Sequence, residues 1–188
     1  MRRLALVVPL SLLAACAATP PANWARGGAL LDIPRARWVY ADLAIDVMPD
    51  GKVLVNGDHQ LNVDRGGRVF GLEAEPVALL EQDGRVTGPN DDALGTIGVL
   101  HASLPGEANA WLTVAQSGAV IRYADDGERQ PFGAWMGCDV TPRAHQTCTL
   151  LTHLLGMRVR KLERQTTTEP VRMGFGSGFG FGMGTPFP

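Results

Sequence analysis

Four short motifs that begin with glycine recur along the middle of the chain. Gly-Lys-Val begins at residue 51, Gly-Arg-Val at 67 and 84, and Gly-Ala-Val at 118, so the starts lie 16, 17 and 34 residues apart. This spacing indicates a unit of about 17 residues with one degenerate copy. Asp, Gly or Ser precedes each glycine and apolar residues flank each motif, which is typical of a hairpin turn in which glycine takes a positive φ. The repeat therefore predicts a series of β-hairpins.

The segment before the first motif supports strands. In DLAIDV, residues Leu43, Ile45 and Val47 alternate with polar or small residues, so one face is apolar. Two short strands cannot bury such a face alone, so successive units must share a sheet or stack. We predict a mainly β fold, an antiparallel meander of short hairpins over residues 37–135. Hairpin signals leave a small barrel and a sandwich equally open.

The pattern changes after Cys138. AHQTCTLLTHLLGMRVRKLER has an apolar stripe at helical spacing, which predicts a helix over about 144–156, with 157–163 continuing it or adding an edge strand. The stripe consists of Cys148, Leu151, Leu154 and Leu155. The end of the chain, MGFGSGFGFGMGTPFP, is low in complexity and is predicted to be disordered. An adhesive role for Phe175, Phe179 and Phe181 is the alternative.

The first twenty residues, MRRLALVVPLSLLAACAATP, have the composition of a signal peptide. Arg2 and Arg3 precede about ten apolar residues, which are too few to span a bilayer. The tetrad Leu13-Ala14-Ala15-Cys16 resembles the lipobox of bacterial lipoproteins, a family that is cleaved before the cysteine and acylated on its thiol and new amino terminus. An ordinary secreted protein, cleaved after Ala15 or Ala18, is the alternative.

The resemblance implies a membrane anchor of acyl chains, palmitate among them, at Cys16, since each buried methylene contributes about 0.8 kcal/mol. Ala17 follows this cysteine, and in the lipoproteins that the chain resembles such a residue does not mark retention in the inner membrane. The implied location is the outer membrane, on its periplasmic or surface face. The Pro- and Gly-rich segment from Ala17 to Gly28 predicts a flexible linker, and the fourteen residues from Cys16 to Leu30 would reach about 48 Å when extended.

The net charge of the mature chain limits the classes of binding partner. Removing residues 1–15 leaves 173 residues with 15 Lys and Arg against 19 Asp and Glu, so the mature net charge is near −4. This argues against nucleic acid or an anionic membrane surface as partner. We divide the chain into a signal peptide (1–15), a lipidated cysteine with linker (16–29), a β-hairpin repeat domain (30–138), a disulfide-tied helical segment (139–165) and a disordered Gly/Phe-rich tail (166–188).

Two cysteines remain once Cys16 carries lipid. Cys138 and Cys148 form an even pair in an oxidising compartment, which predicts a disulfide. A Cys2His2 metal site with His145 and His153 is the alternative, although no Cys-x-x-Cys pair occurs. We therefore expect no metal and no cofactor.

Acidic clusters accompany the predicted turns. Asp83, Asn90-Asp91-Asp92 and Asp125-Asp126 lie where turn geometry favours Asp and Asn, which indicates turn chemistry. Calcium is the alternative, since its ligands are oxygen atoms, but the EF-hand pattern is absent.

Catalytic signatures are weak. The mature chain has three serines, Ser103, Ser117 and Ser177, and none lies in a Gly-x-Ser-x-Gly elbow. The alternative is an envelope hydrolase whose Ser-His-Asp site is assembled from residues far apart in the sequence. Its base would be His59, His101 or His153.

Three aromatic residues late in the meander are candidate ligand contacts: Trp111, Tyr123 and Trp135. Core packing is the alternative, and full burial of both tryptophans would remove the ligand-binding hypothesis. The segment GGRVFGLEAEPVALLEQDGRVTG also resembles Asp-Gly hairpin repeats of uncharacterised envelope lipoproteins of Gram-negative bacteria, over about residues 48–138. The leading hypothesis is a non-enzymatic envelope lipoprotein with a structural or protein-interaction role; a hydrolase and a ligand-binding module are the alternatives.

Overall fold

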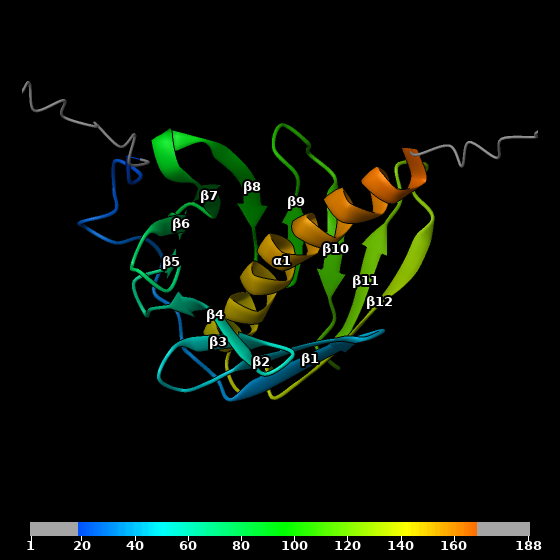
Figure 1. Ribbon diagram of the computed structural model, residues 1–188, viewed down its shortest axis with the longest axis horizontal. Helices are drawn as coiled ribbons and strands as arrows, with labels where there is room; N and C mark the ends of the chain where they lie inside the picture. Colours follow the sequence, from blue (N-terminus) through cyan, green and yellow to red (C-terminus); the bar gives the residue numbers. More distant parts are fainter. Residues whose placement is uncertain (1–18, 169–188) are drawn as a thin grey trace, which may run out of the picture.

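The computed structural model describes residues 19–168, which form a closed barrel of twelve antiparallel strands around one long helix (Figure 1). Each strand pairs with the next along the chain, and β12 pairs with β1 to complete the barrel. The strands are β1 (Ala36–Tyr40), β2 (Leu43–Val47), β3 (Lys52–Val55), β4 (Asp58–Val63), β5 (Arg68–Phe70), β6 (Pro76–Leu80), β7 (Arg85–Thr87), β8 (Ala93–Ile97), β9 (His101–Ser103), β10 (Ala110–Val114), β11 (Ala119–Tyr123) and β12 (Arg129–Met136). The predicted meander is confirmed. Of the two architectures that the sequence left open, a barrel and a sandwich, the chain adopts the barrel.

Alternate connections lie at the same end of the barrel, because successive strands run in opposite directions. One end, which we call the turn rim, carries the connections 48–51, 64–67, 81–84, 98–100 and 115–118. The other end, which we call the loop rim, carries the connections 41–42, 56–57, 71–75, 88–92, 104–109 and 124–128; the connection 88–92 includes the 3-10 turn η1 (Pro89–Asp91).

The repeated glycines form the turn rim. Gly51, Gly67, Gly84 and Gly118 have φ values of 92°, 75°, 88° and 87°, which L side chains rarely adopt. Each N–H closes its own turn, and each carbonyl accepts an N–H from the strand that follows the hairpin, as from Trp135 to Gly118 at 2.8 Å. The glycine repeat is thereby confirmed as a hairpin signal, and it also joins neighbouring hairpins.

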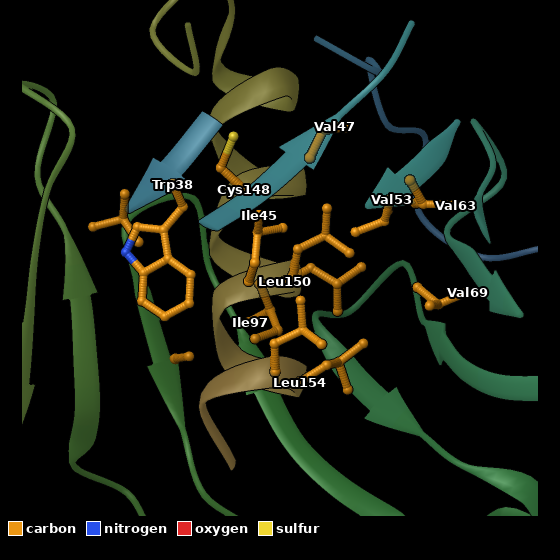
Figure 2. Packing of buried hydrophobic residues seen from close by; sticks show 14 of the residues in the cluster. Trp38, Ile45, Val47, Val53, Val63, Val69, Ile97, Cys148, Leu150 and Leu154 are labelled. Atoms are coloured by element: carbon orange, nitrogen blue, oxygen red, sulfur yellow. The ribbon is translucent and has the colours of Figure 1, made fainter. Parts of the chain in front are cut away.

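The helix α1 (Pro142–Thr168) enters at the turn rim, passes through the barrel and ends beyond the loop rim (Figure 1). A barrel of twelve strands is too wide for its own side chains to fill, so its lumen needs another element. Nearly every residue from Ala144 to Gly156 is buried, and Figure 2 shows Leu150 and Leu154 packed among side chains of the barrel wall. The prediction of a single apolar stripe is wrong, because the barrel surrounds the helix on all sides. Of the two predictions for 157–163, continuation of the helix is confirmed.

The disulfide ties α1 to the last strand at the turn rim. Cys138 and Cys148 are bonded, with a Cα–Cα distance of 6.2 Å, so the predicted pairing is confirmed. Thr141 caps the helix, because its Oγ1 accepts the N–H of Ala144 at 3.0 Å and donates to Asp32 at 2.7 Å. The entry of the helix into the barrel is thus fixed covalently and by hydrogen bonds.

Residues 19–29, which we call the strap, run along the outside of the barrel before the chain enters β1. Gly28 N donates to Gly66 O and Ala29 N donates to Leu80 O, each at 2.7 Å. The prediction of a flexible linker up to Gly28 is therefore wrong from Thr19 onward. The signal peptide, Cys16 and most of the predicted Gly/Phe-rich tail lie outside the described residues.

Candidate functional site

The buried polar side chains of α1 bind the barrel wall. Thr147 Oγ1 donates to Asp32 O and Thr149 Oγ1 donates to Val99 O, both at 2.8 Å. His145 Nε2 donates to Val114 O at 2.9 Å. Because the acceptors are backbone carbonyls of β10, of the connection 98–100 and of the segment before β1, these bonds fix the height and rotation of the helix in the lumen.

Trp135 reaches the same helix from β12. Its Nε1 donates to Thr152 Oγ1 at 2.7 Å, and this hydroxyl donates to Cys148 O at 2.7 Å. The indole is 3% exposed, so Trp135 packs in the core and its polar atom is used there. No buried side-chain nitrogen or oxygen lacks a partner in the part of the chain that the structure describes.

His153 lies between the helix and the barrel wall. Trp111 Nε1 donates to His153 Nδ1 at 2.7 Å, so the imidazole proton is on Nε2, which donates to Leu94 O at 2.7 Å. The ring passes close to Gly95, where an added Cβ would lie 3.1 Å from Nε2. Burial lowers the pKa of His153 to about 4, against the opposing effect of the Leu94 carbonyl. The imidazole is neutral at pH 7 and serves as a packing and hydrogen-bonding group.

A bulge in β10 directs Trp111 inward. The register between β9 and β10 shifts between Ala110 and Leu112, so Trp111 and Leu112 are both buried although they are adjacent. The extra residue turns the indole toward His153. The alternation of the sequence contains no signal for this bulge.

A cleft of about 720 Å³ lies below the loop rim, beside the exposed part of α1. Its lining includes His101, Thr113 and Tyr123 from β9, β10 and β11. His101 Nδ1 lies 3.0 Å from Thr113 Oγ1, which lies 3.4 Å from the Tyr123 hydroxyl. The guanidinium of Arg160 lies 5.8 Å from the centre of the Trp111 ring and pairs with Asp125. This row of polar groups can bind a polar ligand by hydrogen bonds beside the ring of Tyr123.

Only two of the three candidate ligand contacts lie at this cleft. Trp111 and Tyr123 line this cleft, and Trp135 does not. Trp111 is only 3% exposed, like Trp135, and both indole nitrogens are hydrogen-bonded inside the barrel. The ligand-binding hypothesis therefore fails for the two tryptophans, which are core residues. Tyr123 is half-buried and offers its hydroxyl to the cleft. Sequence reasoning missed Arg160, whose helical position gave no sign that it would reach Trp111.

The hydrolase hypothesis requires a histidine base within hydrogen-bond distance of a nucleophile. His59 Nε2 contacts Leu61 O at 3.1 Å and Asn62 Oδ1 at 3.0 Å, and His101 contacts a threonine hydroxyl. Within residues 19–168, none of the hydrogen bonds of the four histidines joins a serine hydroxyl. The contact of His101 with Thr113 places an imidazole 3.0 Å from a hydroxyl.

The Cys2His2 metal site, which was the alternative to the disulfide, does not form. The disulfide consumes both cysteine ligands, and His145 and His153 use Nε2 on backbone carbonyls. Among residues 19–168, no group of three or more His, Cys, Asp or Glu side chains could hold a metal ion.

The acidic clusters bind backbone N–H groups. Asp83 Oδ1 accepts the N–H of Arg85 at 3.1 Å, and this bond and the Arg85 side chain lower the pKa of Asp83. Asp126 accepts the N–H of Glu128 at 2.9 Å in the same way. Asn90 and Asp91 accept N–H groups of the strap, which is a role the sequence did not suggest.

Within residues 19–168, no helix is long and apolar enough to cross a membrane. Comparisons with protein-family models, curated proteins and solved structures find no match for this chain. No relative therefore assigns a role to any residue of the cleft or the rims.

Proposed function

We propose that this chain is a non-enzymatic lipoprotein of the bacterial cell envelope, anchored in the outer membrane through Cys16, whose barrel binds a protein partner at its turn rim. The lipobox-like tetrad Leu13-Ala14-Ala15-Cys16 supports the anchor, and the disulfide is consistent with an oxidising compartment.

The distribution of exposed apolar side chains carries the proposal for a protein partner. Six large hydrophobic residues are exposed among the described residues, and four of them lie at the turn rim: Leu30 (64%), Val99 (41%), Met136 (63%) and Val140 (73%). All four lie at the end of the barrel where α1 begins. Exposed apolar residues gathered on one face are typical of protein interaction sites.

The turn rim is also rigid. The repeated glycine turns are bonded to the following strands, and the disulfide holds the start of α1 against β12. A surface that is already fixed loses little conformational entropy on binding, so a modest apolar area suffices for a specific contact.

The test is crosslinking in intact cells followed by affinity isolation of the full-length protein. Met136→Asp and Val140→Asp place charges on the turn rim and should abolish recovery of the partner. Leu72→Asp is the matched control, because Leu72 is 59% exposed at the loop rim and should tolerate the charge. Cys16→Ser should release the protein from the membrane. A partner retained by both turn-rim variants would contradict the proposal.

A second candidate function is the binding of a polar ligand in the cleft beside Tyr123. The observation that favours it is the row of His101, Thr113 and Tyr123 next to the Trp111 ring. Binding of oligosaccharides, followed by tryptophan fluorescence, should then weaken at least tenfold in Tyr123→Ala, a loss of about 1.4 kcal/mol. Unchanged binding in this variant would remove the candidate.

A further inference from the structure

We infer that the loop rim of the barrel faces the membrane and that the turn rim points away from it. The inference rests on the proposed lipid anchor at Cys16 and adds the orientation in which that anchor holds the barrel. Its basis is the place where the strap meets the barrel.

The strap begins at the loop rim, where the connection 88–92 clamps it. Thr19 N donates to Asn90 Oδ1 at 3.1 Å, and Asn90 N donates to Thr19 O at 2.7 Å. Ala22 N donates to Asp91 Oδ1 at 2.9 Å. Asn90 and Asp91 both have a φ of 60°, a conformation that Asn and Asp adopt more readily than other L residues. The loop therefore holds an unusual backbone geometry while it binds the strap.

The strap then follows the barrel wall to the turn rim. Asn23 Nδ2 donates to the carboxylate of Glu81 at 3.1 and 3.2 Å, and Arg68 Nε donates to Trp24 O at 2.7 Å. The bonds of Gly28 and Ala29 at the turn rim complete the path. Because the strap contacts the barrel along its whole length, it adds no length to the connection between Cys16 and the barrel.

The chain between Cys16 and the clamp, which we call the tether, is consequently short. Cys16 precedes Thr19 by three residues, which span at most about 11 Å even when fully extended. The five residues of β10 extend about 17 Å along the strand, which gives about 13 Å of height between the two rims at a strand tilt of about 40°. Because the tether is shorter than this height and starts at the loop rim, an acyl chain on Cys16 enters the bilayer beside the loop rim.

Covalent attachment, rather than charge, sets this orientation. The loop-rim connections contain no Lys or Arg and nine acidic residues: Asp42, Glu73, Glu75, Asp91, Asp92, Glu107, Asp125, Asp126 and Glu128. Arg158, Arg160 and Lys161 of α1 leave the barrel at the same rim and offset part of this charge. Repulsion by anionic lipids is screened over about 8 Å at physiological salt, which is close to the tether length. The rim is therefore held near the lipid surface without binding it tightly.

The experiment compares two probes on the full-length chain, purified from an acylating bacterial host and reconstituted in phosphatidylcholine vesicles with nitroxide-labelled headgroups. A fluorophore is attached at Glu107→Cys or at Gln116→Cys. Both residues are exposed, and they flank β10 at the loop rim and at the turn rim respectively. We expect quenching at position 107 to exceed that at 116 by at least about threefold, because the two probes differ in height by about 13 Å.

A release variant tests the role of the clamp. Asn90→Gly with Asp91→Gly keeps the positive φ without strain and removes both side-chain acceptors, so the ratio should fall toward one. Asp92→Gly changes the neighbouring residue, whose φ is −62°, and should keep the ratio. Equal or reversed quenching in the acylated parent chain would overturn the orientation alone. Intact mass without acyl chains on Cys16 would instead overturn the proposed anchor, and the orientation with it.

Discussion

The two rims of the barrel are built differently. The turn rim repeats one short glycine turn, and each of the four glycines bonds both its own hairpin and the next strand. The loop rim has connections of two to six residues with no common motif, and acidic side chains dominate them. One rim is therefore specified by a repeated local geometry, whereas the other is free to carry the strap clamp and part of the cleft.

The helix is also held differently at the two rims. At the turn rim a disulfide joins it to Cys138, whereas nearer the loop rim the contacts of the described residues are noncovalent, among them the hydrogen bonds of His153 with Trp111 and Leu94 and the ion pair of Arg160 with Asp125. We therefore expect the turn rim to stay folded under conditions that loosen the other end. Four predictions test this difference.

The largest expected effect comes from the turn glycines. Gly118→Ala combines a φ of 87° with a Cβ placed 2.1 Å from the Trp135 carbonyl oxygen, and should lower the free energy of unfolding by about 3 to 4 kcal/mol. Gly127→Ala, at a loop-rim glycine with a φ of 84° and nothing within 4 Å, should cost about 1 to 2 kcal/mol. Urea denaturation of both variants measures the difference, and equal losses would show that the rims do not differ.

The next effect concerns pH. Because burial lowers the pKa of His153 to about 4 from 6.5, the unfolded chain binds a proton that the folded protein excludes between these values. His153 should thus remove about 3 kcal/mol of stability as the pH falls from about 6.5 to 4. His153→Gln keeps an acceptor for Trp111 and a donor for Leu94, and should flatten this part of the stability profile. His59→Gln, at a half-buried histidine of β4, is the control, and identical profiles for both variants would contradict the assignment.

A similar but smaller effect is expected from the disulfide. Cys138→Ala with Cys148→Ala should lower the free energy of unfolding by about 2.5 to 3 kcal/mol, because the unfolded chain regains the entropy of the closed loop. Hydrogen exchange should rise most in the first turns of α1, at the turn rim. Faster exchange confined to the helix beyond Gly156 would argue that the disulfide does not distinguish the rims.

The smallest expected effect concerns the hydroxyls of α1. Thr152→Val removes the acceptor of the buried Trp135 N–H and should cost about 2 kcal/mol. Thr149→Val removes a donor to the carbonyl of Val99 in a more exposed turn, and should cost about 1 kcal/mol. Thermal unfolding ranks the two variants, and a larger loss for Thr149→Val would reverse the expected order.

The glycine repeat and the cysteine pair were informative in the sequence because their structural effects are local. A turn glycine determines the conformation of about four residues, and Cys138 and Cys148 are only ten residues apart. The hairpins, the meander and the disulfide were therefore predictable. The surroundings of α1 were not, although residues 144–157 contain no charged side chain, which is a signal of complete burial.

The candidate site was predicted in part. Trp111 and Tyr123 are recognisable as aromatic residues of late strands, but no sequence pattern indicates the register of β10 or the bulge that turns Trp111 toward His153. The strap was missed because Pro and Gly are common both in flexible linkers and in segments packed on a surface. A packed segment differs from a flexible linker only in its hydrogen-bond partners. The partners of the strap lie more than 40 residues away in the sequence; they are Asn90, Asp91, Glu81 and Arg68.

The sequence by itself determined the order of hairpins, the position of the turn rim, the disulfide and the existence of a helix, because each depends on residues close together in the chain. Only the tertiary structure decided that twelve strands close into a barrel, that the helix fills it and that the strap fixes the first described residues at the loop rim. These features depend on which surfaces meet after closure. Burial of apolar area is roughly proportional to contact area and has no direction, so sequence patterns identify an apolar face but not the surface that covers it.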